Sequence, residues 1–278
     1  MAAPDPNADS RAPLSVEAAP APPKLRGTVI VRPDTEDLFS VLAADLLIHA
    51  ANCVRAFGDF HLALSGGGTP MPFYRRLLVD PAYRSLPWER AHLWIVDERR
   101  VPVTDPRSNY RAIAEYIVDH TDIPARNVHP IAAMEPDADT RYERELKETL
   151  AWREKGHDRL DFVLLGMGAD GHTASLFPGS PALREERRLV SVNRGSTVTP
   201  PDRVTMTYPL INSSRFIAVL ITGEAKRDAV ARVSARVAPP DELPILGVRP
   251  IGMGEDDAAG VLRWYLDHDA CPSDGRAR

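Results

Sequence analysis

Short apolar segments alternate with longer amphipathic segments along most of this chain. The short segments are rich in Val, Ile and Leu, which is typical of buried strands, and they lie at residues 28–31, 61–64, 92–96, 161–165, 189–192, 204–207 and 216–221. The spacing of the segments between them predicts helices at 35–57, from 70 through 78, and at 110–120, 137–156, 224–237 and 256–267.

Strands that alternate with helices indicate an α/β fold. We expect a Rossmann-like, doubly wound, mainly parallel sheet with helices on both faces. Residues 1–25 are rich in Ala and Pro, which predicts a disordered tail. We expect residues 26–270 to form a single α/β domain and residues 271–278 to form a flexible C-terminus.

Four segments with unusual chemistry each follow a predicted strand. They are residues 65–69, 97–99, 166–172 and 222–226. In open parallel sheets, ligands bind beyond the carboxyl ends of the strands. The sequence therefore predicts one crevice that gathers all four segments.

The first of these segments reads Ser65-Gly-Gly-Gly-Thr-Pro70. Three glycines between a strand and a helix allow consecutive backbone amides to turn toward a phosphate at the helix N-terminus. The alternative is a tight turn in which the glycines only permit positive φ. The segment is not a P-loop, because the chain contains no Gly-Lys-Ser/Thr sequence.

The second glycine cluster, Gly166-Met-Gly-Ala-Asp-Gly171, has the spacing of a dinucleotide fingerprint. The helix that this fingerprint requires would be cut by Pro178, and the acidic residue expected about 20 positions later falls in a charged loop. We therefore expect no NAD site. His172 directly follows the cluster, close to Asp170, and a histidine in that position suits general-base chemistry.

Other chemical features of the sequence carry less information. His172 could instead be a turn histidine bonded to its own backbone, and we assign the seven other histidines to ordinary surface or core positions. No two histidines have metal-ligand spacing on one element. Asp97-Glu-Arg99 could be a solvated charge cluster, although its place at a strand end favours a role in the site.

Composition narrows the classes of function. The formal net charge of −5 disfavours nucleic-acid binding, and 44% hydrophobic residues without an uninterrupted apolar run of roughly 18 residues disfavour a membrane protein. Cys53 and Cys271 fit neither a disulfide framework nor a metal motif, which agrees with a cytoplasmic location.

Taken together, the motifs resemble those of 6-phosphogluconolactonases. The resemblance runs from about residue 29 to residue 267 and rests on Ser65–Pro70, Asp97–Arg99 with Asn109, Gly166-Met-Gly-Ala-Asp-Gly-His-Thr-Ala-Ser-Leu-Phe-Pro178, Arg203-Val-Thr205 and Thr222-Gly-Glu-Ala-Lys226. It implies a Rossmann-like fold and hydrolysis of 6-phospho-D-glucono-1,5-lactone to 6-phospho-D-gluconate in the oxidative pentose phosphate pathway.

The resemblance also implies roles for individual residues. His172 corresponds to the general base, and Asp170 is its orienting or polar partner. The residues implied in binding the substrate and its phosphate are Ser65, Gly66, Gly67, Gly68, Thr69, Asp97, Arg99, Asn109, Gly168, Arg203 and Lys226. The Gly- and Pro-rich stretch 247–254 is longer than the family pattern, and we assign no site residues there.

The chemistry of a lactone agrees with these residues. Hydrolysis needs a water molecule, a base and donors for the oxyanion, so we expect neither a metal nor a cofactor. The expected partner is a small sugar-phosphate lactone, with no nucleic acid or membrane, and the protein is expected to be a monomer or a weak homo-oligomer.

Two other functions remain open. Glucosamine-6-phosphate deaminases or isomerases have similar glycine motifs, but they typically continue after Asp-Gly-His with Asn-Glu, where this chain has Ser175-Leu-Phe-Pro178. A non-catalytic sugar-phosphate sensor would need a DNA-binding module, and the N-terminal tail is too short and too poor in basic residues to form one.

Overall fold

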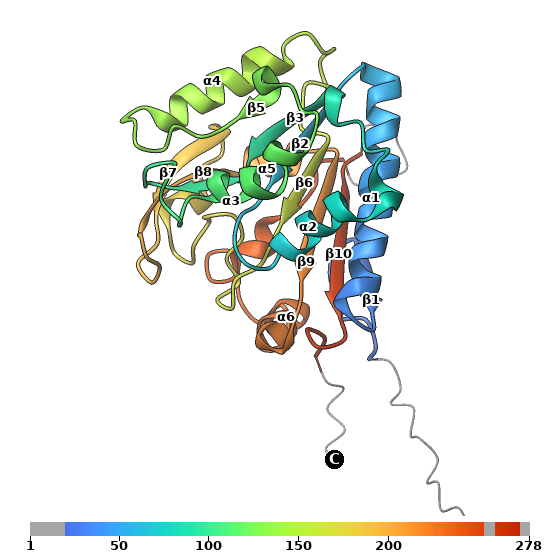
Figure 1. Ribbon diagram of the computed structural model, residues 1–278. Helices are drawn as coiled ribbons and strands as arrows, with labels where there is room; N and C mark the ends of the chain where they lie inside the picture. Colours follow the sequence, from blue (N-terminus) through green and yellow to red (C-terminus); the bar gives the residue numbers. More distant parts are fainter. Residues whose placement is uncertain (1–19, 253–258, 273–278) are drawn as a thin grey trace, which may run out of the picture.

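The computed structural model describes residues 20–252 and 259–272. Its larger sheet has seven parallel strands in the order β1-β10-β9-β6-β2-β3-β5 (Figure 1). The strands are Thr28–Arg32 (β1), Phe60–Leu64 (β2), Ala91–Ile95 (β3), Val128–His129 (β5), Phe162–Leu165 (β6), Phe216–Ile221 (β9) and Val261–Asp267 (β10). The predicted mainly parallel sheet is confirmed.

Helices cover this sheet. They are Thr35–Phe57 (α1), Met71–Val79 (α2), Asn109–Tyr116 (α3), Ala138–Leu150 (α4), Tyr208–Ser213 (α5) and Arg227–Ala235 (α6). Every residue of β2, β6 and β9 is buried. Strands that are covered on both faces carry continuous apolar runs, which explains why these segments are apolar without alternation.

Helix α1 shows how local sequence sets the boundaries of an element. Asp34 caps its N-terminus by accepting a hydrogen bond from the backbone N–H of Asp37 at 2.8 Å, and Gly58 ends it in a left-handed conformation with φ of 87°. The helix is long and apolar enough to cross a membrane by length and composition alone. Its apolar face, including Leu38 and Leu42, is buried and the helix packs against β1, β2 and β10.

A smaller antiparallel sheet lies on the opposite side of the molecule from α1 (Figure 1). Its strands, in the order β4-β8-β7, are Asp97–Arg99 (β4), Asp202–Met206 (β8) and Val190–Arg194 (β7). Residues 97–99 follow a strand, as the sequence predicted. They also form a strand of their own, because their backbone pairs with residues 203–205, far away in the chain.

The predicted helix at 256–267 is wrong for the residues of this segment that the structure describes. Residues 256–258 lie outside the described part of the chain, and Val261–Asp267 forms β10 between β1 and β9. Trp264, Tyr265 and Leu266 are all buried, because both faces of this strand are covered. An apolar run of this length is equally compatible with a buried helix or a buried strand, and the neighbouring strands decide between them.

Other predicted helices begin or end at different residues. The helix predicted at 137–156 ends at Leu150, and the one predicted at 110–120 ends at Tyr116, followed by a 3₁₀ turn. The segment 224–237 begins as a 3₁₀ helix over Glu224–Lys226 before α6. Residues 1–19 of the predicted tail and 273–278 of the predicted C-terminus lie outside the described residues.

Candidate active site

The four segments expected to converge follow four adjacent strands, β9, β6, β2 and β3. They line one cavity of about 230 Å³ at the carboxyl ends of these strands. Its lining residues are Ser65, Gly66, Gly67, Gly68, Thr69, Pro70, Asp97, Arg99, Asn109, Gly166, Met167, Gly168, His172, Ala174 and Lys226. The expected crevice is therefore present, and it holds most of the residues that the sequence singled out.

The glycine loop forms one wall of this cavity. Gly67 has φ of +91°, a conformation that side chains other than glycine rarely adopt. The backbone C=O of Ser65 accepts a hydrogen bond from the Tyr74 hydroxyl at 2.7 Å, which ties the loop to α2. Because α2 begins at Met71, its N-terminus adjoins the cavity, and this geometry suits an anion such as phosphate.

Asn109 packs against the glycine loop. Its side-chain NH₂ donates to the backbone C=O of Asp97 at 2.7 Å, and its amide fills the space where a side chain on Gly66 would lie. Asn109 is only 2% exposed. The tight approach explains why position 66 needs glycine, independently of its φ angle.

The buried carboxylate of Glu98 holds Asn109 in place. It accepts hydrogen bonds from the backbone N–H groups of Arg99, Asn109 and Tyr110 and from the Ser108 hydroxyl, at 2.7 to 2.9 Å. Burial raises the pKa of Glu98, and these four hydrogen bonds oppose the shift. The carboxylate thus joins β4 to the N-terminus of α3.

The second glycine cluster forms a turn that presents His172. The backbone N–H of Gly168 donates to the C=O of His172 at 2.8 Å, and Gly171 has φ of +85°. A side chain on Gly168 would collide with the His172 ring and would lie 2.6 Å from Asp170 Oδ1. Turns follow His172 where a dinucleotide site requires a helix, so the fingerprint is not part of a dinucleotide fold.

Asp170 and His172 form a hydrogen-bonded pair. Nδ1 of His172 lies 2.6 Å from Oδ1 of Asp170, which also accepts the backbone N–H of His172 at 3.1 Å. Partial burial opposes ionisation of Asp170, but the hydrogen bonds and electrostatic attraction from His172, together with a backbone hydrogen bond of Asp170 itself, outweigh burial and lower the pKa of Asp170. An ionised Asp170 accepts a hydrogen bond from Nδ1–H, which leaves the lone pair on Nε2 free.

Asp97 connects the His172 turn to the smaller sheet. Its carboxylate accepts a hydrogen bond from the Ser175 hydroxyl at 2.5 Å, and the backbone N–H of Ser175 donates to the Thr205 hydroxyl at 3.1 Å. Arg99 lines the same wall, and its guanidinium donates to the backbone C=O of Arg107 at 2.6 Å. The two walls of the cavity are therefore linked through β4.

Two of the three predicted basic residues, Lys226 and Arg203, lie in different surroundings. Lys226 lines the cavity, at the end of the 3₁₀ turn after β9. Arg203 is 5% exposed, is not among the lining residues, and donates to the backbone C=O groups of Pro200 and Asp202. Its guanidinium lies 5.9 Å from the centre of the Phe177 ring, so Arg203 contacts Phe177 and the segment around the start of β8 instead of the cavity.

The sequence assigned no role to Met167, Ala174 or Pro70, which also line the cavity. Met167 and Ala174 are within the motif that contains His172, but apolar residues carry no chemical signal. Ala174 has φ of +49°, which a sequence pattern does not reveal because alanine rarely adopts it.

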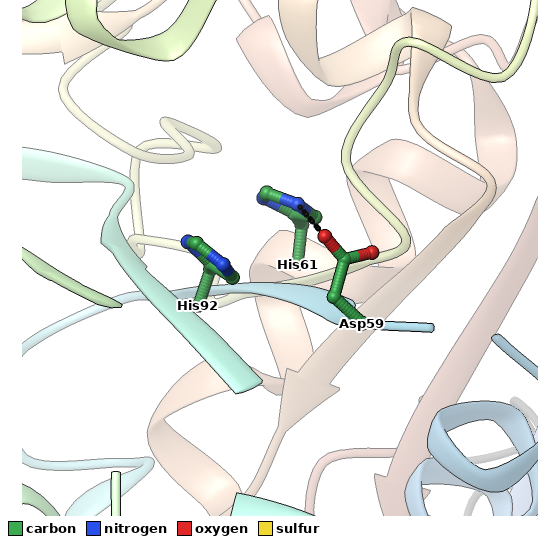
Figure 2. A group of neighbouring side chains, drawn as sticks. All are labelled: Asp59, His61 and His92. Carbon is green, nitrogen blue, oxygen red and sulfur yellow. Dashed lines mark hydrogen bonds and ion pairs between the residues drawn. The ribbon is translucent and has the colours of Figure 1, made fainter. Parts of the chain in front are cut away.

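A histidine cluster lies at the other end of the sheet, where β2 and β3 begin. Figure 2 shows Asp59, His61 and His92, whose potential ligand atoms lie within 4.8 Å of one another. The two imidazole rings stack with centres 4.5 Å apart and planes 16° apart, so their in-plane lone pairs do not meet at one point. This arrangement does not fit a metal ion.

The hydrogen bonds of His61 also argue against a metal site. Its Nδ1 accepts the indole N–H of Trp94 at 3.1 Å, so the neutral ring carries its proton on Nε2, which lies 3.2 Å from the Asp59 carboxylate. The nitrogen nearest Asp59 therefore has no free lone pair for a metal. The cluster packs the sheet instead of forming a metal centre.

Comparison with known proteins identifies the family. The model of the family described as glucosamine-6-phosphate isomerases/6-phosphogluconolactonase matches residues 33–256. The chain belongs to this family. A crystal structure of 6-phosphogluconolactonase from Thermotoga maritima has a TM-score of 0.72 and 26% sequence identity, and the match covers 86% of this chain and 99% of that one.

Relatives in the family carry lactonase names. A 6-phosphogluconolactonase from Synechocystis is 42% identical over 217 residues, which cover 77% of this chain and 84% of that protein. The GDH/6PGL endoplasmic bifunctional protein from Homo sapiens is 40% identical over 255 residues, which cover 89% of this chain. This chain spans only 30% of the length of that bifunctional protein.

Proposed function

We propose that this protein hydrolyses 6-phospho-D-glucono-1,5-lactone to 6-phospho-D-gluconate. The observation that carries the proposal is the hydrogen bond between Asp170 and His172 in a cavity that also contains the glycine loop. One part of the site suits proton transfer and the other suits a phosphate. The names of relatives in the same family support this choice of substrate.

In the proposed reaction, His172 acts as the general base. Asp170 accepts a hydrogen bond from Nδ1–H, so the lone pair of Nε2 is free to remove a proton from water while the water oxygen attacks the lactone carbonyl. The bond between the carbonyl carbon and the ring oxygen then breaks. The proton held on Nε2 passes to the departing ring oxygen, which yields the open-chain acid and restores neutral His172.

The glycine loop and Lys226 are proposed to hold the phosphate. The positive end of α2 and the ammonium group both favour a dianion in this part of the cavity. A phosphate anchored there fixes the distance between the lactone carbonyl and His172, which lowers the barrier through positioning. Arg99, Asp97 and Asn109 are proposed to form the wall beside the sugar ring.

For Arg203 to bind the phosphate, its guanidinium must first leave the backbone C=O groups to which it donates in this structure. In the sequence motif it resembles a phosphate ligand, whereas its guanidinium is bonded to backbone C=O groups here. Replacing Arg203 with Lys would keep the charge but lose this fixed arrangement. If the KM for 6-phosphogluconolactone is unchanged in Arg203→Lys, Arg203 does not bind the phosphate.

The test is a hydrolysis assay with freshly prepared 6-phosphogluconolactone, corrected for spontaneous hydrolysis. We expect His172→Asn to lower kcat by about 10² or more while the protein still binds 6-phosphogluconate. Near-normal turnover by this variant would contradict the general-base assignment. The proposed mechanism uses no metal, so activity should survive a chelator, and its loss would contradict that part.

The assay also separates the two activities found in this family. Glucosamine 6-phosphate, offered in the same experiment, should release no ammonia, because Ser175-Leu-Phe-Pro178 replaces the Asn-Glu sequence typical of the deaminases. Ammonia release without lactone hydrolysis would reverse the proposal. A lactonase that requires the phosphate should also prefer the phosphorylated lactone to gluconolactone.

A further inference from the structure

The imidazole of His172 is held by a hydrogen bond on one edge and by an aromatic ring on one side. Its ring centre lies 5.1 Å from that of Phe177, with the planes tilted by 53°. Phe177 is 5% exposed, whereas the side chain of His172 is 29% exposed. Rotation of the ring about its bond to Cβ would break the single hydrogen bond between Nδ1 and Asp170, and the contact with Phe177 restricts this rotation.

The smaller sheet holds Phe177 in place. Gly195 follows β7, and a Cβ atom at this position would lie 2.7 Å from Cε2 of Phe177 and 2.6 Å from Cγ2 of Val198. The Phe177 ring therefore occupies space that only a glycine at position 195 leaves free. Arg203 of β8 lies on the same ring, with its guanidinium carbon 5.9 Å from the centre.

A second contact fixes the same segment to β7. The side-chain NH₂ of Asn193 donates to the backbone C=O of Ser175 at 2.7 Å and to the hydroxyl of Ser180 at 3.0 Å. Asn193 is 8% exposed, so these bonds are protected from water. Phe177 lies between the two anchored residues, and its backbone is therefore attached on both sides.

We propose that Phe177 is a positioning residue that orients His172 for proton transfer, with the Gly195 turn as its support. The inference rests on the proposed role of His172 as general base. The smaller sheet thereby has two roles, because it supplies Asp97 to the wall of the cavity and also supports Phe177. Phe177 is not among the residues that line the cavity, so β7 and β8 act on the reaction through Phe177 and the orientation of His172.

The first test replaces Phe177 with Leu, which keeps an apolar side chain but removes the ring. Phe216→Leu is the matched control, because Phe216 is also 5% exposed and lies at the start of β9, at the other end of the sheet from the cavity. We expect Phe177→Leu to lower kcat about tenfold or more, with KM changed less than about threefold, because misplacing a catalytic group acts mainly on the chemical step. The control should keep kcat.

A spectroscopic measurement separates positioning from general loss of structure. The ¹⁵N shifts of the His172 imidazole, assigned by their absence in His172→Asn, report which nitrogen carries the proton. We expect one Nδ1–H tautomer in the unsubstituted protein, and a mixture of tautomers in Phe177→Leu. If kcat is retained, or if kcat falls while the tautomer is unchanged, the proposal is wrong.

Gly195→Ala provides a second variant that keeps Phe177. The added methyl group displaces the ring, so the same loss of kcat and the same change of tautomer are expected, and Gly195→Ala with normal kcat would also overturn the proposal. The two hypotheses fail separately. Activity that survives His172→Asn defeats the proposed function, whereas activity lost in His172→Asn but kept in Phe177→Leu defeats only the role of Phe177.

Discussion

The side-chain amide of Asn109 occupies the space that a side chain at position 66 would need. Gly66→Ala should therefore lower stability by about 1–3 kcal/mol, because the new methyl group forces Asn109 or the loop to move. Thermal or urea unfolding measures this effect. Gly68 is the control, since a Cβ there meets nothing within 4 Å. Equal unfolding midpoints for Gly66→Ala and Gly68→Ala would contradict this account of the loop.

Asp170→Asn tests the tautomer of His172. The amide of Asn offers an N–H as well as an oxygen, so Nδ1 can accept a hydrogen bond and Nε2 then carries the hydrogen that should be absent from the base. We expect kcat to fall by about 10² or more, with little change in the binding of 6-phosphogluconate. Asp241→Asn, which alters a surface ion pair with Arg184, is the control. A normal kcat for Asp170→Asn would show that the carboxylate is dispensable.

Glu98→Gln tests the carboxylate that joins β4 to α3. Its two oxygens accept four hydrogen bonds, and an amide NH₂ in place of one oxygen faces N–H donors that it does not satisfy. We expect a loss of roughly 1–3 kcal/mol in the free energy of unfolding. Glu115→Gln on α3 removes only a surface pair with Arg111 and should cost less than about 0.5 kcal/mol. Similar losses for both variants would refute the role of Glu98.

The histidine cluster predicts how stability depends on pH. Burial, together with His61 and His129, lowers the pKa of His92 to about 4, compared with about 6.5 for an unfolded histidine. Between these values the unfolded chain binds a proton that the folded protein rejects, so stability falls as pH decreases from about 6.5 to about 4. Urea unfolding at pH 7 and pH 5 should give a smaller drop for His92→Gln than for the unsubstituted protein.

Exposed His120 provides the comparison for this experiment. His120→Gln should show the same drop between the two pH values as the unsubstituted protein. The outcome that contradicts the assignment is a drop that is reduced equally by the two substitutions, because that would mean that the position of His92 in the stack has no special effect.

The sequence predicted which segments line the cavity better than it predicted the bounds of the strands and helices. Residues 65–69 and 166–172 could be placed because glycine clusters after buried strands mark turns that other residues do not fit, and parallel strands bring their carboxyl ends together. The bounds of α1, 35–57, were correct because caps and periodicity are both local signals. Strand β9, 216–221, was likewise predicted with the observed bounds.

Features that depend on distant pairing could not be predicted. Nothing within residues 97–99 indicates that they pair with β8, and Arg203 has the same charge whether it lies in the cavity or against Phe177. The support of Phe177 by Gly195 is also a tertiary contact, visible only when β7 is placed beside the His172 turn. The local sequence pattern indicates which side chains can take part in the reaction, whereas their orientation depends on contacts between residues far apart in the chain.

Strand β10 has a consequence for the order in which the protein can assemble. Among the described residues, the first strand, β1, is hydrogen-bonded in the large sheet only to β10, which spans Val261–Asp267. During synthesis on the ribosome, β1 must therefore wait until residues 261–267 have been made before its partner strand exists. Contacts this far apart in sequence slow folding, so β1 stays unpaired in the nascent chain long after it has been made.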